Sequence, residues 1–235
     1  YNGFGYSILG EIIVKITDKS LEENYAEKIF NPLGMNNSGS YFNTKLVEKI
    51  AYGYQQNWEN NFIPPVFFAK TNTTLGGGGL YSTTEDLLKW HNALQNNTLL
   101  PDELMKIYFG HHFQFSDNDG YCYGNYYDSL KINEKKSLGI YSHGGSLPGN
   151  SSLIFRVPES NQCIILLTNG GMGHEQFLYT IATEIMNILY NEEFHMPKLS
   201  LVYPLIYTAF FADIDVMNKQ YFFLKENAPD AYVFE

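Results

Sequence analysis

The sequence is poor in the features that mark disulfide scaffolds, metal sites and membrane spans. It has two cysteines, Cys122 and Cys163, no Cys-x-x-Cys pair, and six histidines without metal-ligand spacing. No run of about 18 apolar residues occurs, so we expect no membrane span in this chain. Both cysteines fall in expected strands. Two buried free thiols are the favoured interpretation, and a disulfide would require the two strands to be neighbours.

Positive charge is also scarce. Lys and Arg total 15 against 25 Asp and Glu, which gives a net charge of −10 and argues against nucleic acid or an anionic membrane surface as the main partner. Hydrophobic residues make up 44% of the 235 residues and charged residues 17%, as in a globular protein of one large or two small domains. The chain starts without an initiator Met, and we expect the N-terminus of the protein to lie upstream.

Hydrophobic periodicity predicts helices first, then a group of strands, then helices again. The last strands are separated by short turns, so we expect an antiparallel sheet. The fold class is therefore α/β in content (α+β), an antiparallel sheet flanked by helices with a helical subdomain. Residues 36–75 lack periodicity and are expected to be functional or to wrap the core. The expected helices are 5–16, 21–30, 84–94, 101–109, 174–190, 201–212 and 214–227, and the expected strands are 121–127, 139–142, 151–157 and 162–168, with 128–137 as a polar connection.

Two glycine-rich stretches are candidates for close contact with a ligand. His143-Gly144-Gly145 follows an expected strand, and bare glycine backbone lets N–H groups approach a bound molecule. A glycine-rich hairpin with a surface histidine fits these residues equally well. Gly76–Gly79 is not a phosphate loop, because no Gly-Lys-Ser/Thr follows it. His91, on the expected helix 84–94, is interpreted as a helix-surface or packing residue and not as a catalyst.

Several short motifs occur in order over residues 1–190. They are Tyr1-Asn2-Gly3-Phe4-Gly5-Tyr6, the run I-F-N-P-L-G-M at 29–35, G-G-L-Y-S-T at 78–83 with Asp86-Leu87, His143-Gly144-Gly145 with Pro148-Gly149, and Asn169-Gly170. Together they resemble the serine β-lactamase and penicillin-binding-protein-like hydrolases, in particular class C β-lactamases with their D-Ala-D-Ala carboxypeptidase and esterase relatives. The resemblance implies a β-lactamase/transpeptidase-like fold whose N-terminal part is missing here.

The resemblance also implies roles for individual residues. Tyr1 matches the tyrosine that shuttles a proton between nucleophile and leaving group. Gly3 stands where the family carries a substrate-binding Asn, which puts amide recognition in doubt. His143 takes the place of the family's basic residue, and the backbone N–H of Ser146 matches an oxyanion donor. Gly144 and Gly145 are expected to admit the substrate. Gly78 and Gly79 are candidates for the cleft wall, with structural packing as the favoured alternative.

The family's nucleophile is the Ser of a Ser-x-x-Lys turn, and this chain has no such motif. No Gly-x-Ser-x-Gly elbow replaces it. In the family the Ser-x-x-Lys turn precedes the tyrosine motif, so we expect it upstream of Tyr1.

Three hypotheses follow. The first is a serine hydrolase that acts through an acyl-enzyme on an ester, a D-amino-acid peptide or a β-lactam, without a metal or organic cofactor. The second is a non-catalytic binding or scaffold protein that keeps the fold. The third is a fragment that exposes an apolar sheet face and self-associates. From the resemblance we also expect an extracytoplasmic location, periplasmic or secreted, a hydrolase domain over residues 1–195, and a helical extension over 196–235.

Overall fold

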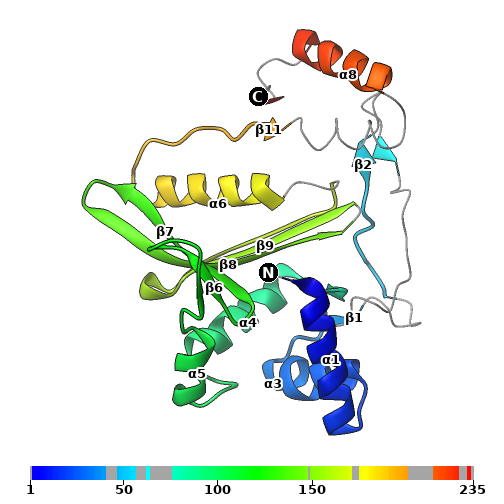
Figure 1. Cartoon of the computed structure of the whole chain (residues 1–235), viewed down its shortest axis with the longest axis vertical. Helices are drawn as coiled ribbons and strands as arrows, with labels where there is room; N and C mark the ends of the chain where they lie inside the picture. Colours follow the sequence, from blue (N-terminus) through cyan, green and yellow to red (C-terminus); the bar gives the residue numbers. More distant parts are fainter. Residues whose placement is uncertain are drawn as a thin grey trace.

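A six-stranded antiparallel sheet forms the centre of the molecule (Figure 1). The computed structural model describes residues 2–40, 47–56, 62–63, 76–147, 149–170, 175–200, 214–227 and 232–233. Figure 1 shows α6 on one face of the sheet and the helices α1, α3, α4 and α5 on the other side. This arrangement confirms the expected fold class. In spatial order the strands are β10 (Gln162–Thr168), β9 (Asn150–Val157), β8 (Lys136–Leu147), β7 (Asn125–Asn133), β6 (Gly120–Cys122) and β5 (Phe113–Gln114).

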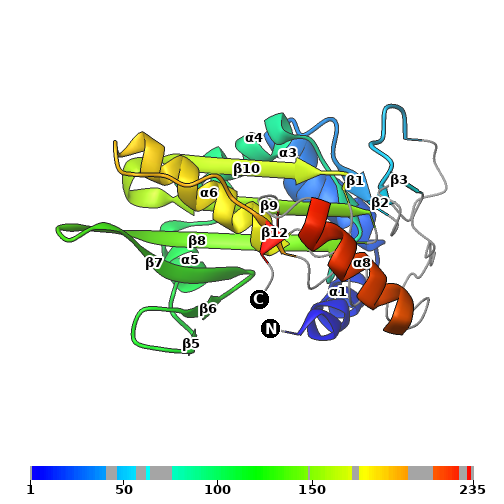
Figure 2. The same ribbon diagram turned by 90° about the horizontal axis from the view of Figure 1, so that it is seen from above.

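The main core lies between the sheet and α6 (Glu175–Leu189). Alternate residues of β8 and β9 point to this face, and Ile140 and Phe155 are completely buried there. The facing residues of α6, Ala182 and Met186, are four apart and are also completely buried. Seen from above, β10, β9, β8 and β7 run side by side beneath this helix (Figure 2).

The N-terminal helices follow the predicted pattern with small changes. α1 (Gly3–Thr17) begins after Asn2, whose side chain accepts the Phe4 and Gly5 N–H groups as an N-cap. The helix expected over 21–30 is α2 (Leu21–Tyr25), which continues through a π-helical turn (Ala26–Phe30) into α3 (Asn31–Leu33). It ends at Gly34, whose φ of 63° lies in the left-handed region.

The helices α4 (Thr84–Gln95) and α5 (Asp102–Tyr108) confirm the next two predictions. Thr83 caps α4, because its hydroxyl accepts the Asp86 N–H at 3.2 Å. Pro101 precedes the first residue of α5, whereas the sequence analysis put it in the first turn. The carboxylates of Asp102 and Glu103 therefore lie in the first turn of α5, where the helix dipole favours negative charge.

The prediction of a single strand over 121–127 is wrong. Those residues form a hairpin of β6 and β7, joined at Tyr123-Gly124, where Gly124 has φ 73°. The expected polar connection over 128–137 is also wrong, because it is mostly strand, divided between β7 and β8. Its polar residues alternate with apolar ones, and the buried Ile132 faces the core.

The strand expected over 139–142 is longer than predicted. β8 continues through His143-Gly144-Gly145 to Leu147, so these glycines are part of the strand. Pairing with β9 holds them there, with Gly144 opposite Leu153 and Gly145 opposite Ser152. The pairing of β8 with β7 ends at Ser142, so it is the ladder with β9 that compensates for the low strand preference of these glycines.

The two cysteines are free. Cys122 is on β6 and Cys163 on β10, and three strands separate them in the sheet. Burial raises the pKa of each thiol to about 11. The structure therefore confirms the free-thiol alternative and rules out the disulfide.

The remaining elements are short pairs of strands and one C-terminal helix. β11 (Leu199–Ser200) pairs with β12 (Tyr232–Val233), and α8 (Ile214–Asn227) confirms the last expected helix. The helix expected over 201–212 lies outside the described residues. Among those described, no helix has the length and hydrophobicity needed to cross a bilayer. In the irregular region 36–75, the described residues include β1 (Gly39–Ser40), β2 (Gln55–Gln56) and β3 (Phe62–Ile63), and β1 pairs with β4 (Leu80–Tyr81).

Candidate active site

His143 lies within β8, opposite Ile154 of β9. Its Nδ1 is 2.6 Å from the carbonyl oxygen of Gly144. Its Nε2 is 3.3 Å from the hydroxyl of Tyr121 on β6. Both ring nitrogens are therefore within hydrogen-bond distance of protein groups.

Two tyrosine rings flank the imidazole. The ring centroids of Tyr121 and Tyr126 lie 6.2 and 5.6 Å from that of His143, and the two tyrosine rings pack edge to face at 4.8 Å. The sequence analysis missed both as site residues. The tyrosine-rich run Y-C-Y-G-N-Y-Y at 121–127 was the available signal, but it was interpreted only as a strand.

Tyr6 connects this group to α1. Its hydroxyl is 3.1 Å from that of Tyr121, and it accepts the Gly124 N–H at 3.0 Å. One side chain of α1 thus reaches the β6–β7 turn beside His143. The sequence analysis used Tyr6 only as part of a motif and gave it no role.

Two of the residues singled out from the sequence are Tyr1 and Gly3. Tyr1 lies outside the described residues. Gly3 is the first residue of the helix, and its carbonyl oxygen lies 3.4 Å from the Ser7 hydroxyl. Asn2 is next to Gly3, which stands where the family carries its substrate-binding Asn. The side-chain oxygen of Asn2 caps the helix.

The glycines at 76–79 divide into two kinds. A Cβ at Gly77 would come within 2.5 Å of the Gly3 carbonyl oxygen, and one at Gly76 would contact that of Tyr6. These two glycines allow the loop to lie directly against the backbone of α1. Gly78 is exposed and has open space at its Cβ position, whereas Gly79 is buried with φ 78°.

The other expected site residues lie on β8 close to His143. A Cβ at Gly145 would be 2.8 Å from the Ser152 hydroxyl, so the two strands approach closely there. Ser146 is exposed and lies opposite Ser151. The structure brings His143, Gly144, Gly145 and Ser146 together on one strand.

A buried carboxylate ties α4 to the loop after α3. Asp86 is fully buried and accepts the Asn37 N–H at 2.7 Å, the Ser38 hydroxyl at 2.9 Å and Lys89 Nζ at 2.8 Å. Burial alone would raise the pKa of Asp86, but these donors outweigh it, and the pKa lies below its ordinary value. The Ser-Thr-x-x-Asp pattern at 82–86 thus caps α4 and anchors the loop after α3. It does not supply a group to the His143 site.

His91 is buried in a second cluster, so of the two expected roles it has the packing role and not the helix-surface role. Arg156 Nε donates to His91 Nδ1 at 3.0 Å, so the ring proton is on Nε2 and is directed at Asn161 Oδ1, 3.3 Å away. Burial, and then the charge of Arg156, lower the pKa of His91. Among the described residues, Arg156 Nη1 has no hydrogen-bond partner.

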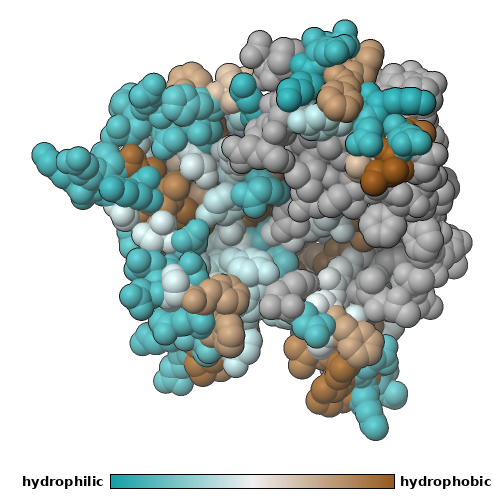
Figure 3. All heavy atoms as spheres, turned by 45° about the horizontal axis from the view of Figure 1, so that its top comes forward, coloured by the Kyte–Doolittle hydropathy of each residue, from teal (hydrophilic) through white to brown (hydrophobic). Residues whose placement is uncertain are grey.

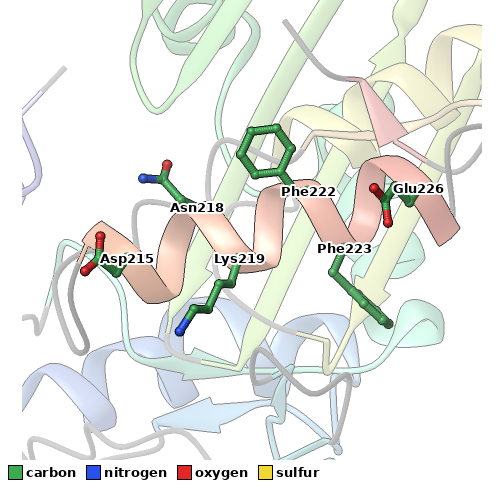
Figure 4. Close-up of a pocket in the computed structure, with 6 residues that line it drawn as sticks. All are labelled: Asp215, Asn218, Lys219, Phe222, Phe223 and Glu226. Atoms are coloured by element: carbon green, nitrogen blue, oxygen red, sulfur yellow. The ribbon is translucent and has the colours of Figure 1, made fainter.

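Two further features bear on ligand binding. The described residues contain no group of three His, Cys, Asp or Glu side chains placed to hold a metal ion. A depression on α8 is lined by charged residues and two phenylalanines, and Figure 1 places this helix at the opposite end of the molecule from α1 (Figure 4). The depression on α8 therefore supplies no group to the His143 site.

This arrangement of helices around an antiparallel sheet is the β-lactamase/transpeptidase fold. A penicillin-binding protein homologue from Pyrococcus abyssi is similar with a TM-score of 0.67 and 26% identity, covering 82% of this chain and 43% of that one. The D-amino acid amidase from Ochrobactrum anthropi has the same fold, with a TM-score of 0.65 at 22% identity over 81% of this chain and 57% of that one.

Sequence comparison identifies the family. The profile of the family described as Beta-lactamase matches residues 1–182, and the chain belongs to that family. It is 24% identical to penicillin-binding protein 4* of Bacillus subtilis over 84% of this chain and 45% of that protein. It is 28% identical to the teichoic acid D-alanine hydrolase of Staphylococcus aureus over 54% of this chain and 31% of that protein. The chain thus spans less than half the length of these relatives.

Proposed function

We propose that this chain supplies one part of the active site of a serine hydrolase, which cleaves an ester, a D-amino-acid peptide or a β-lactam through an acyl-enzyme. The observation that carries the proposal is the strand segment His143–Ser146, held in register by β9 and flanked by tyrosines from β6 and β7. Relatives named as a D-alanine hydrolase and a D-amino acid amidase support the hydrolase class.

Each proposed residue has a separate task in this reaction. Tyr1 transfers the proton between the nucleophile and the leaving group. The Ser146 N–H donates to the oxyanion of the tetrahedral intermediate, and the lack of side chains at Gly144 and Gly145 lets the substrate approach the strand. Gly3, Gly78 and Gly79 line the substrate side. Because the sequence has no Ser-x-x-Lys, the nucleophile comes from polypeptide outside this sequence.

Intact mass spectrometry tests the proposal. The protein is weighed before and after incubation with a β-lactam or a fluorophosphonate. A species well above 26.9 kDa that gains one covalent adduct is the expected result. A 26.9 kDa species without an adduct would contradict the hydrolase proposal for this chain.

A non-catalytic binding protein is the second candidate. Gly3 replaces the family's substrate-binding Asn, and Asn2 is occupied as a helix cap. Binding of a β-lactam or D-alanyl peptide without turnover, measured by calorimetry, would favour this alternative.

The proposal extends to location and domain organisation. We place the protein outside the cytoplasm, in the periplasm or secreted, by analogy with the family. The hydrolase domain covers residues 1–195, and residues 196–235 form an extension that includes α8. The family match over residues 1–182 lies within the proposed domain.

A further inference from the structure

A chain of hydrogen bonds runs from the β6–β7 turn through two tyrosines to His143. It consists of Gly124 N to Tyr6 Oη at 3.0 Å, Tyr6 Oη to Tyr121 Oη at 3.1 Å, and Tyr121 Oη to His143 Nε2 at 3.3 Å. It ends with His143 Nδ1 at 2.6 Å from the Gly144 carbonyl oxygen. We call these residues the tyrosine relay.

The direction of each proton in the relay follows from the Gly144 carbonyl at one end together with a neutral imidazole, in which only one ring nitrogen carries a proton. A carbonyl oxygen can only accept, so His143 Nδ1 carries a proton and donates it to Gly144. In the neutral imidazole Nε2 is then an acceptor, and Tyr121 donates to it. A tyrosine has one hydroxyl proton, so the bond between the two phenols takes its proton from Tyr6. The Gly124 N–H can only donate, and Tyr6 accepts it, so every bond between Gly124 and His143 runs towards His143.

We infer that Tyr121, braced by Tyr6, is a positioning residue that holds His143 as the neutral Nδ1–H tautomer bonded to the Gly144 carbonyl. The consequence lies in the backbone of β8. The Gly144 carbonyl belongs to the peptide group that precedes Gly145, so fixing it orients the strand just before the proposed oxyanion donor, the Ser146 N–H. His143 therefore acts on the strand through its hydrogen bonds.

The catalytic part of this inference rests on the proposed function, but the tautomer does not. ¹⁵N NMR of the imidazole in the full chain reports which nitrogen is protonated and whether the other accepts a hydrogen bond. We expect a protonated Nδ1 and a hydrogen-bonded Nε2 in the wild type. In Tyr121→Phe the Nε2 signal should move towards that of an acceptor without a donor.

Two further variants make the test specific. Tyr6→Phe should move the Nε2 signal in the same direction by a smaller amount, and it should also shift the Gly124 amide signal. Tyr123→Phe is the matched control, because Tyr123 is on the same hairpin and its ring contacts His112. It should leave the His143 signals unchanged. If Tyr121→Phe does not fold, the Gly124 amide and His143 signals of Tyr6→Phe decide the question.

In the complete protein, which contains the proposed upstream nucleophile, turnover of a chromogenic ester or β-lactam gives the second readout. We expect Tyr121→Phe to lower kcat on the order of tenfold with KM nearly unchanged, because the strand is misaligned for the transition state. An Nε2–H tautomer in the wild type, or an Nε2 signal that Tyr121→Phe does not move, would overturn the inference. A moved signal with unchanged kcat would overturn the positioning role. A wild type without turnover would instead refute the proposed function and leave the tautomer result standing.

Discussion

The sheet with α6 and the helix α1 have similar apolar side chains but very different packing. Phe155 and Met186, in the layer between the sheet and α6, are 0% exposed, whereas Phe4 and Ile16 of α1 are 71% and 78% exposed. Of the residues of α1, all of which the structure describes, only Gly10 is buried. Figure 3 shows hydrophobic side chains gathered on the surface of the lobe where Figure 1 places α1.

The difference shows that the two regions are held in different ways. The sheet and α6 exclude water from a continuous apolar core, which is the main source of folding free energy. α1 is attached through the Tyr6 hydrogen bonds and through the direct backbone approach of Gly76 and Gly77. Among the described residues, α1 thus carries exposed apolar side chains, whereas the third hypothesis from the sequence expected an exposed apolar face on the sheet.

The largest expected effect is in the core. Phe155→Ala should lower the free energy of unfolding by about 3–5 kcal/mol, because it removes a fully buried ring and leaves a cavity. Phe4→Ala is the matched control and should change it by less than about 0.5 kcal/mol. Urea denaturation followed by circular dichroism measures both. Equal losses in the two variants would mean that α1 is as well packed as the sheet.

The next effect concerns Asp86. Asp86→Asn should cost about 1–3 kcal/mol at neutral pH, because the donors from Asn37, Ser38 and Lys89 lose a buried charge. The folded-state pKa of Asp86 is lowered, so its contribution is fully present above the unfolded pKa of about 3.9 and is lost as pH falls through the folded value.

Urea midpoints measured across that pH range provide the check. The gap in stability between wild type and Asp86→Asn should narrow as the solution is acidified below about pH 4. A gap that stays constant with pH would contradict the assigned role of the carboxylate.

A smaller effect is expected where the loop at 76–79 meets α1. Gly77→Ala should destabilise the protein by about 1–2 kcal/mol, because its Cβ would be 2.5 Å from the Gly3 carbonyl oxygen. Gly78→Ala, which faces open space, should have almost no effect. Thermal unfolding of the two variants distinguishes them, and equal melting temperatures would refute a close loop–helix contact.

The smallest expected change in stability comes from the exposed face of α1. Replacing Ile8, Ile12 and Ile16 together with Gln should alter the free energy of unfolding by no more than about 0.5 kcal/mol in total, because all three side chains are exposed. It should nevertheless reduce concentration-dependent self-association, because it removes a contiguous apolar surface. Sizing chromatography with light scattering measures this, and Ile188→Gln on α6 is the control. A chain that is monomeric without any substitution would count against self-association.

Sequence patterns predicted the elements whose residues carry a clear period. The α6 spacing and the β-branched strand 162–168 are examples, and both lie within a residue or so of their predicted ends. The β6–β7 hairpin was missed because its turn, Tyr123-Gly124, lies inside an aromatic run that is equally compatible with one strand. The glycines of β8 show no strand preference of their own, and pairing with β9 determines their conformation.

The candidate site was predicted only in part for a related reason. His143 and its glycines form a contiguous motif, which is visible in sequence. Tyr6 and Tyr121 are 115 residues apart, and only the folded sheet brings their hydroxyls to 3.1 Å. A contact of this kind depends on tertiary structure and leaves no periodic signal in the chain.

The two thiols have a consequence for chemical durability. With a pKa of about 11, Cys122 and Cys163 are thiolates in only roughly one molecule in ten thousand at pH 7, against a few per cent for an ordinary cysteine. Since the thiolate is the reactive species, alkylation, mixed-disulfide formation and peroxide oxidation should all be slow in the folded protein. The same folded chain can therefore persist in an oxidising environment with both sulfur atoms reduced.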